Sequence, residues 1–279
     1  MIARTTVMRV ALAAAAVLAS VSAGLADGPQ AEIKWSQPIV RLMDVDPAVT
    51  DPALIYGWDQ VSQGLGFLVA DDFRCNDPRP VTDIHWWGSY VGYQAGDVLQ
   101  HPDAFLIRFW TDVPAGADPD MQWSHPGQVI HEILCANYQV SADPVGQDIN
   151  VYMWQAYGET IVMDDCYQYN QTLDPTEYFN QEFDTIYWLS IQAIYDEANL
   201  PGTSWGWKTR PNYFNDDAVM GTVEQGQMFL EDTIRWDPIQ DYQGNSWDTA
   251  FELSVPEPAT LALMGLGAVA FLVRRRRRG

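Results

Sequence analysis

The sequence predicts an all-β protein with a β-sandwich or jelly-roll-like fold, and three observations support this. Short apolar runs that alternate with polar residues recur along the chain, separated by Pro, Gly, Asp and Asn. Helical periodicity is almost absent. The chain also carries 12 Trp, 13 Tyr and 10 Phe. This aromatic content is enough to build one large core.

The predicted strands follow one another at regular spacing. They cover residues 65–73, 81–90, 104–110, 129–140, 149–157, 159–169, 185–194, 204–209, 227–234 and 246–253. Residues 31–52 are interrupted by proline, so we expect them to form an edge or a wrapping arm. In the strand at 104–110, alternation places Phe105, Ile107 and Phe109 on the inner face. One helical turn is expected at 174–181, where Asp174 precedes Pro175 as an N-cap precedes proline.

The N-terminus has the pattern of a secretory signal peptide. Arg4 and Arg9 form a basic start, residues 10–19 are apolar, and small residues follow up to Ala26. Cleavage after Ala23 or after Ala26 fits this pattern, and we prefer Ala26. The signal peptide therefore spans residues 1–26, and the body of the chain is exported.

The C-terminus has three parts: Pro256-Glu257-Pro258, an uncharged run at 259–273, and the arginines at 274–278. The run makes roughly 22 Å of helix, which is short of the ~30 Å hydrocarbon core of a bilayer. Arginines directly after it hold that end on the cytoplasmic side. We therefore expect a transmembrane helix with transient membrane association, and a body outside the inner membrane.

This tail closely resembles the PEP-CTERM sorting signal of Gram-negative bacteria. The resemblance implies that Pro256, Glu257 and Pro258 are recognised by an exosortase, which removes the helix. It also implies an association with exopolysaccharide or biofilm. The chain thus divides into a signal peptide (1–26), a β-sandwich domain (27–254) and a sorting signal (255–279). The expected partners are the exosortase and the secretion machinery, and the expected location is the cell surface or the extracellular space.

A second resemblance covers most of residues 31–253. The segments that carry it are 69–73, 81–90, 105–112, 124–127, 187–192, 205–209 and 216–219. Together they resemble a secreted β-sandwich domain that recurs in planctomycete-type PEP-CTERM proteins. This resemblance implies a fold and a compartment, and it implies no catalytic residues.

The body is strongly acidic. Seven of the 15 basic residues lie in the two terminal signals, whereas only Glu257 of the 37 acidic residues does. Eight basic and 36 acidic residues remain, a formal net charge of −28. Because phosphate backbones are held by Lys and Arg, nucleic acid is excluded as a partner.

Paired aspartates are the candidate metal ligands, since Ca²⁺ prefers oxygen donors. The candidate Ca²⁺ ligands are Asp71 and Asp72 in one pair and Asp216 and Asp217 in another; the residues at 164–165 form a third pair. The alternative is that these aspartates cap turns through bonds to the local backbone. We expect no other cofactor. The four histidines lie at spacings that match no compact zinc pattern.

Two enzymatic interpretations have some support in the sequence. Residues 202–206 match the Gly-x-Ser-x-Gly nucleophile elbow, but Pro211 blocks a following helix and every histidine precedes Ser204. A pair of carboxylates would serve glycoside hydrolysis, yet the sequence does not single out two of the 36. We therefore expect a non-enzymatic surface or matrix protein that binds polysaccharide or calcium. A glycoside hydrolase is the alternative.

Aromatic residues offer a platform for sugar rings. Trp86 and Trp87 must face opposite sides of a strand, whereas Trp205 and Trp207 share a face. Tryptophans in a sandwich are more often core residues. The three cysteines, Cys75, Cys135 and Cys166, allow one disulfide, and the sequence does not choose the pair.

Overall fold

The computed structural model describes residues 32–255, apart from 65, 93–98, 197–201 and 224–232. Residues Ile33–Val255 form one compact unit. The predicted signal peptide, the sorting signal from Pro256 onward and most of the predicted strand at 227–234 lie outside the described residues. No helix in the described part is long and apolar enough to cross a membrane.

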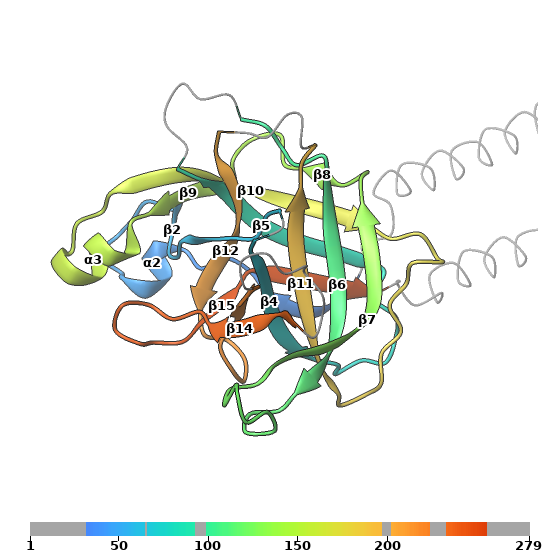
Figure 1. The fold of residues 1–279 in the computed structure, drawn as a ribbon. Coiled ribbons are helices and arrows are strands. Elements are labelled where there is room, and N and C mark those ends of the chain that lie inside the picture. Colours follow the sequence, from blue (N-terminus) through green and yellow to red (C-terminus); the bar gives the residue numbers. More distant parts are fainter. Residues whose placement is uncertain (1–31, 65, 93–98, 197–201, 224–232, 256–279) are drawn as a thin grey trace, which may run out of the picture. The chain divides into compact units, whose positions relative to one another are not determined.

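The described chain is mostly β and forms two sheets, one of which curls into a half-barrel (Figure 1). The smaller sheet has the order β14-β13-β4-β11-β6-β7, and neighbouring strands in this order run antiparallel. Its strands are β4 (Leu68–Arg74), β6 (Ala104–Val113), β7 (His125–Cys135), β11 (Ile186–Ile194), β13 (Val219–Thr222) and β14 (Arg235–Pro238).

The larger sheet has the order β1-β16-β5-β10-β9-β2, with β3, β8, β12 and β15 joined at its sides. Its strands are β1 (Glu32–Gln37), β2 (Leu54–Ile55), β3 (Asp59–Val61), β5 (Asp83–Val91), β8 (Gln139–Val140), β9 (Gly146–Ile149), β10 (Val162–Thr172), β12 (Ser204–Pro211), β15 (Trp247–Thr249) and β16 (Phe251–Val255). Strand β5 pairs with β16 along its first half and with β12 along its second half. The sheet therefore branches at β5, and β12 pairs in turn with β3.

The largest hydrophobic cluster collects side chains from both sheets. As predicted, Phe105, Ile107 and Phe109 of β6 all belong to it. On the opposite face of β6, Trp110 packs in a second cluster with Trp188 and Trp236. Both faces of the smaller sheet thus bury aromatic rings in the described structure.

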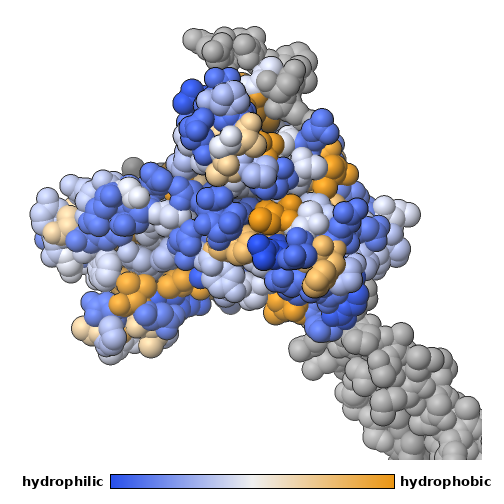
Figure 2. Space-filling view, turned by 90° about the horizontal axis from the view of Figure 1, so that it is seen from below, coloured by the Kyte–Doolittle hydropathy of each residue, from blue (hydrophilic) through white to orange (hydrophobic). Residues whose placement is uncertain are grey.

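The tryptophans considered as sugar platforms are buried. Trp86, Trp205 and Trp207 are fully enclosed, and Trp87 is only 6% exposed, packed against Ile55 in a separate cluster. None of the four is therefore available to stack on a sugar ring. Figure 2 shows that the face seen from below is mainly hydrophilic, with hydrophobic residues in several small areas. This agrees with the acidic composition.

One predicted strand is wrong. The sequence predicts an extended segment at 149–157, but helix α3 (Val151–Tyr157) forms there. The Asn150 side chain accepts a hydrogen bond from the Met153 amide at 3.0 Å, and Gly158 closes the helix with φ of 70°. These two end signals outweigh the β-propensity of the aromatic residues between them.

The expected helical turn at 174–181 is a hydrogen-bonded turn. Its Glu177 amide donates to the Asp174 carbonyl at 2.8 Å, and no helix follows. The other described helix, α2 (Leu42–Val45), lies in the segment predicted as an arm. In that segment β1 does form a strand that pairs with β16 at the end of the sheet order, as expected for an edge.

Removing the N-cap should destabilise helix α3. We expect Asn150→Ala to lower the free energy of unfolding by about 1 kcal/mol, because the Met153 amide loses its acceptor. Asn150→Ser is the matched control, since serine also caps and should leave the stability within a few tenths of a kcal/mol. Urea unfolding of the two variants checks this, and equal losses in both would contradict the capping role.

Candidate functional site

A cavity of about 550 Å³ lies where α3 approaches β3, β9 and the segment after β14. Its lining residues come from widely separated parts of the chain: residues 58–60, 91–92, 148–152, 155, 163–164, 220 and 238–242. This volume is in the range of small-ligand sites. We call this cavity the α3 cleft.

Aromatic rings form one part of the α3 cleft. Trp58 is half-buried and packs on Trp247 with ring centroids 4.5 Å apart. Tyr152 of α3 and Tyr242 are 50% and 52% exposed, and their ring centroids are 4.9 Å apart. Since most aromatic rings of the domain are enclosed, this exposed pair beside a cavity stands apart from them.

Side-chain amides surround the aromatic rings. The Gln60 Oε1 accepts from the Trp58 indole at 3.4 Å, and Gln155 Nε2 donates to the Tyr56 hydroxyl at 2.7 Å and to Asp241 Oδ2 at 3.3 Å. Burial raises the pKa of Asp241, but hydrogen bonds from Asn245 and Gln243 outweigh that effect and leave the pKa below its usual value. The cleft therefore offers both donors and acceptors.

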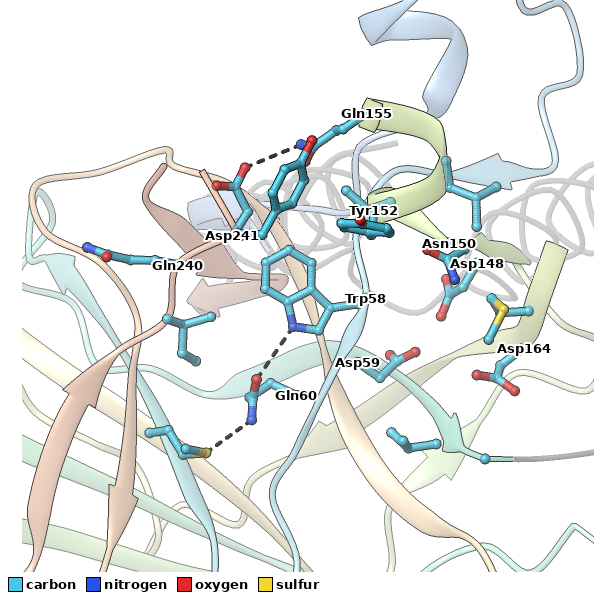
Figure 3. Close-up of a pocket in the computed structure, with 18 of the residues that line it drawn as sticks. Trp58, Asp59, Gln60, Asp148, Asn150, Tyr152, Gln155, Asp164, Gln240 and Asp241 are labelled. Atoms are coloured by element: carbon cyan, nitrogen blue, oxygen red, sulfur yellow. Dashed lines mark hydrogen bonds between the residues drawn. The ribbon is translucent and has the colours of Figure 1, made fainter. Parts of the chain in front are cut away.

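Carboxyl groups occupy the other side. Figure 3 shows Asp59, Asp148 and Asp164 gathered on one side of the Trp58 ring, with Gln240 and Asp241 on the other. The Lys208 Nζ forms a buried ion pair with Asp148 Oδ1 at 2.6 Å. The Ser89 hydroxyl donates to Asp148 Oδ2 at 2.7 Å. Asp148 lines the cavity, whereas its two partners, Lys208 and Ser89, do not.

The remaining two carboxyls have raised pKa values. Burial, followed by the neighbouring Asp148, raises the pKa of Asp59 well above its usual range. The neutral, protonated form of Asp59 is therefore favoured. Burial, followed by the Asp148 charge, raises the pKa of Asp164 to about 6. At neutral pH, Asp164 is mostly ionised.

The structure separates the aspartates that the sequence singles out for Ca²⁺. Asp71 points into the core between the sheets, where its Oδ2 accepts hydrogen bonds from the Thr249 amide at 2.6 Å and from Gln37 at 2.8 Å. Asp72, the next residue of β4, is bonded by Asn215 instead, at 2.8 Å. Adjacent residues of a strand face opposite sides, so Asp71 and Asp72 do not converge on one ion.

Asp72 and Asp216 are brought together. The Asn215 Nδ2 donates to Oδ2 of both, at 2.8 Å and 3.1 Å. The Ser124 hydroxyl also donates to Asp216, while Asp217 accepts from Gln240 at 2.7 Å. Across the described part of the chain, no three His, Cys, Asp or Glu side chains are placed to hold a metal ion. Ca²⁺ at these aspartates stays a prediction.

The two members of the third aspartate pair have different surroundings. Asp164 lines the α3 cleft, whereas Asp165 is not a lining residue and accepts from Gln147 at 3.1 Å. Ser204 opens strand β12, so no helix follows the Gly-x-Ser-x-Gly pattern. All three cysteines are buried free thiols, so none of the pairings that the sequence left open is made.

Sequence reasoning missed most of the α3 cleft. Asp59 begins β3, a short strand that the sequence pattern does not predict. The same pattern places Tyr152 in a strand, whereas it lies in helix α3. Asp148 and Asp164 are more than 80 residues from Asp59. The sequence does carry a local signal for helix α3. Asn150 is a recognisable N-cap and Gly158 a recognisable C-cap, and the seven residues of the helix lie between them.

The fold and the cleft define a class: a mostly β domain with a cleft lined by aromatic and acidic side chains. The chain belongs to the family described as Domain of unknown function (DUF7901), whose model matches residues 33–254. A second model, the PEP-CTERM protein-sorting motif, matches residues 254–278. This motif implies export, exosortase processing and sorting to the cell surface, as the tail predicted. No curated protein and no solved structure matches the chain.

Proposed function

We propose that this exosortase-sorted protein binds extracellular polysaccharide in the α3 cleft and does not cleave it. The observation that carries the proposal is the exposed Tyr152 and Tyr242 pair beside a cavity of about 550 Å³. Sugar rings have apolar faces that stack on aromatic rings, and their hydroxyls bond amides and carboxylates. The α3 cleft supplies both kinds of group in one place.

Binding is favoured over the alternative, glycoside hydrolysis, by the arrangement of the carboxyls. Catalytic carboxyl pairs stand about 5–5.5 Å or about 6.5–9.5 Å apart, so that the sugar or a water fits between them. Asp148 is engaged by the Lys208 ammonium group and by the Ser89 hydroxyl, so it is not free to act as one of two such carboxyls. Asp148 also contributes to the raised pKa of its neighbour Asp59. These contacts support a binding role.

We extend the proposal to the fold type and the lineage of the domain. The two sheets form a β-sandwich of jelly-roll type, which the core cluster shared by both sheets supports. The domain is of the planctomycete type. A domain carried to the cell surface by a sorting motif would meet polysaccharide there, in a matrix or surface role.

Truncating the exposed tyrosine should weaken binding. We expect Tyr152→Ala to raise the Kd for a bound oligosaccharide about tenfold, equivalent to about 1.4 kcal/mol, because one stacking surface is lost. Calorimetry with the full-length protein and cellohexaose, chitohexaose or the N-acetylated chitohexaose measures this.

The control is Phe183→Ala, which removes an aromatic ring that is 66% exposed and lies outside the α3 cleft. This control should bind as the unaltered protein does. An equal loss in both variants would count against the α3 cleft. Release of reducing ends from any of these oligosaccharides would overturn the non-enzymatic part of the proposal.

A further inference from the structure

We infer that the carboxyl side of the α3 cleft receives an ammonium group, so that the polysaccharide bound there is an amino-sugar polymer with free amines. This inference rests on the proposed polysaccharide-binding function. It adds to that function the charge of the ligand and the residue that selects it, Asp164.

The lining of the α3 cleft is negatively charged. Among the described residues that line it, four are aspartates and none is lysine or arginine. The nearby Lys208 is fully buried, and its ammonium group is engaged by Asp148. It therefore neutralises one carboxylate without presenting positive charge to the cavity. A carboxylated or sulfated sugar would meet only repulsion here.

The three gathered carboxyls differ in their partners. Asp148 is bonded by Ser89 and paired with Lys208, whereas burial and the neighbouring Asp148 raise the pKa of Asp59 and favour its neutral form. The Asp164 carboxylate receives no hydrogen bond from the residues that the structure describes, although it is half-buried. A partly desolvated carboxylate at a cavity wall is a suitable partner for a ligand ammonium, and such a pair is stronger than a neutral hydrogen bond.

The protonation of Asp164 links binding to pH. The charged groups that act on it are Asp148 of β9, Lys208 of β12, Asp165 beside it on β10 and Asp59 of β3. Burial and Asp148 raise the pKa of Asp164 to about 6, while Lys208 opposes them. A bound ammonium would favour the ionised form and lower that pKa. Binding therefore releases protons, and the affinity falls as the pH drops below about 6.

The geometry also explains how one ligand uses both sides of the α3 cleft. The carboxyls lie on one side of the Trp58 ring (Figure 3). A sugar that stacks on an aromatic ring of the cleft can direct a substituent at its edge toward the carboxyls. In an N-acetylated sugar that substituent is a neutral amide, which gains no charge pairing with Asp164.

The test compares three hexasaccharides by calorimetry on the full-length protein at pH 6.5: chitohexaose, its fully N-acetylated form, and a galacturonate oligomer. We expect chitohexaose to bind at least tenfold more tightly than the acetylated form. The galacturonate oligomer should not bind. At pH 4.5 the preference for chitohexaose should shrink to about twofold, because Asp164 is then protonated.

The selecting residue is tested with Asp164→Asn, and Asp165→Asn serves as the matched neighbour outside the cavity. The first variant should lose the preference for chitohexaose while it keeps its affinity for the acetylated form, and the second should keep both. Asp164→Glu retains the charge and should keep the preference. If the asparagine variant does not fold, loss of the preference in the glutamate variant would still overturn the inference.

The outcomes separate the ammonium inference from polysaccharide binding itself. Equal or tighter binding of the acetylated form, with loss on Tyr152→Ala, would overturn the ammonium inference and leave polysaccharide binding in place. Tighter binding of the galacturonate oligomer would overturn the inference as well. Binding of none of the three would overturn the ammonium inference, because an amino-sugar polymer is the ligand that it names, and absence of binding to cellohexaose as well would overturn polysaccharide binding.

Discussion

Raising the pH from about 4 to 9 should destabilise the domain, and Asp72→Asn should remove a large part of that dependence. Burial raises the pKa of Asp72 from 3.8 to about 8, partly opposed by the hydrogen bond from Asn215. A carboxyl whose pKa is higher in the folded state binds more protons when folded. Its stabilising contribution is therefore present below about pH 4 and is lost as the pH rises through about 8.

The size of the effect has an upper bound. A shift of about four units corresponds to at most about 5 kcal/mol at about 1.4 kcal/mol per unit, and relaxation around the buried charge will reduce it. We expect Asp72→Asn to stabilise the protein by about 2–4 kcal/mol at pH 9 and by less than about 1 kcal/mol at pH 4. Asparagine has the same shape and stays neutral. Urea unfolding across this pH range measures both values.

The control is Asp237→Asn, which removes an exposed carboxylate paired with Arg235 at the surface and should shift stability little at any pH. Asp248 and Asp71 also have raised pKa values, so some pH dependence should persist in the Asp72 variant. An unchanged slope would contradict the assignment to Asp72. Added Ca²⁺ tests the metal hypothesis in the same experiment, because an ion bound at Asp72 and Asp216 would stabilise the protein most above pH 8.

Replacing Lys208 should cause the other large loss of stability. We expect Lys208→Met to lower the free energy of unfolding by about 3–5 kcal/mol at pH 8, because breaking a buried ion pair leaves an uncompensated charge. Burial lowers the pKa of Lys208, but the carboxylates of Asp148 and Asp59 outweigh that effect and raise it. Lys208 is therefore charged in the folded protein.

The matched control removes both charges. The double variant Lys208→Met with Asp148→Asn should recover at least half of the lost stability, since no buried charge is then left without its partner. Thermal unfolding of both variants at pH 8 checks this. Losses that simply add would contradict the coupling of Lys208 to Asp148.

How far the sequence predicts this protein can be judged from particular elements. The alternation in residues 104–110 correctly placed Phe105 and Phe109 in the core, because the two-residue period of a strand is a local property. The predicted strand at 149–157 is wrong, because its aromatic residues are compatible with a strand and the helix is set by Asn150 and Gly158 at its ends. Capping is also a local property, so the sequence does carry the signals for this helix.

The α3 cleft was not predictable in the same way. Trp58, Asp148, Asp164 and Tyr242 approach one another because β3, β9, β10 and the segment after β14 meet in the folded chain. No residue spacing in the sequence indicates that these strands and this segment lie close together. The aspartate pairs are visible in the sequence, but whether a carboxylate caps, pairs or faces a cavity depends on neighbours that come from other strands.

The sequence by itself determined the sorting of this protein and its mostly β character. A sorting motif is read by other proteins as a linear segment, and strand periodicity is set within a few residues. Only the tertiary structure decided which aromatic rings are buried and which carboxyls have raised pKa values. Trp205 is enclosed, and Asp148 acts on Asp59, because strand pairing brings together residues far apart in the chain. Burial and charge coupling act over a few ångströms in space, whatever the distance along the sequence.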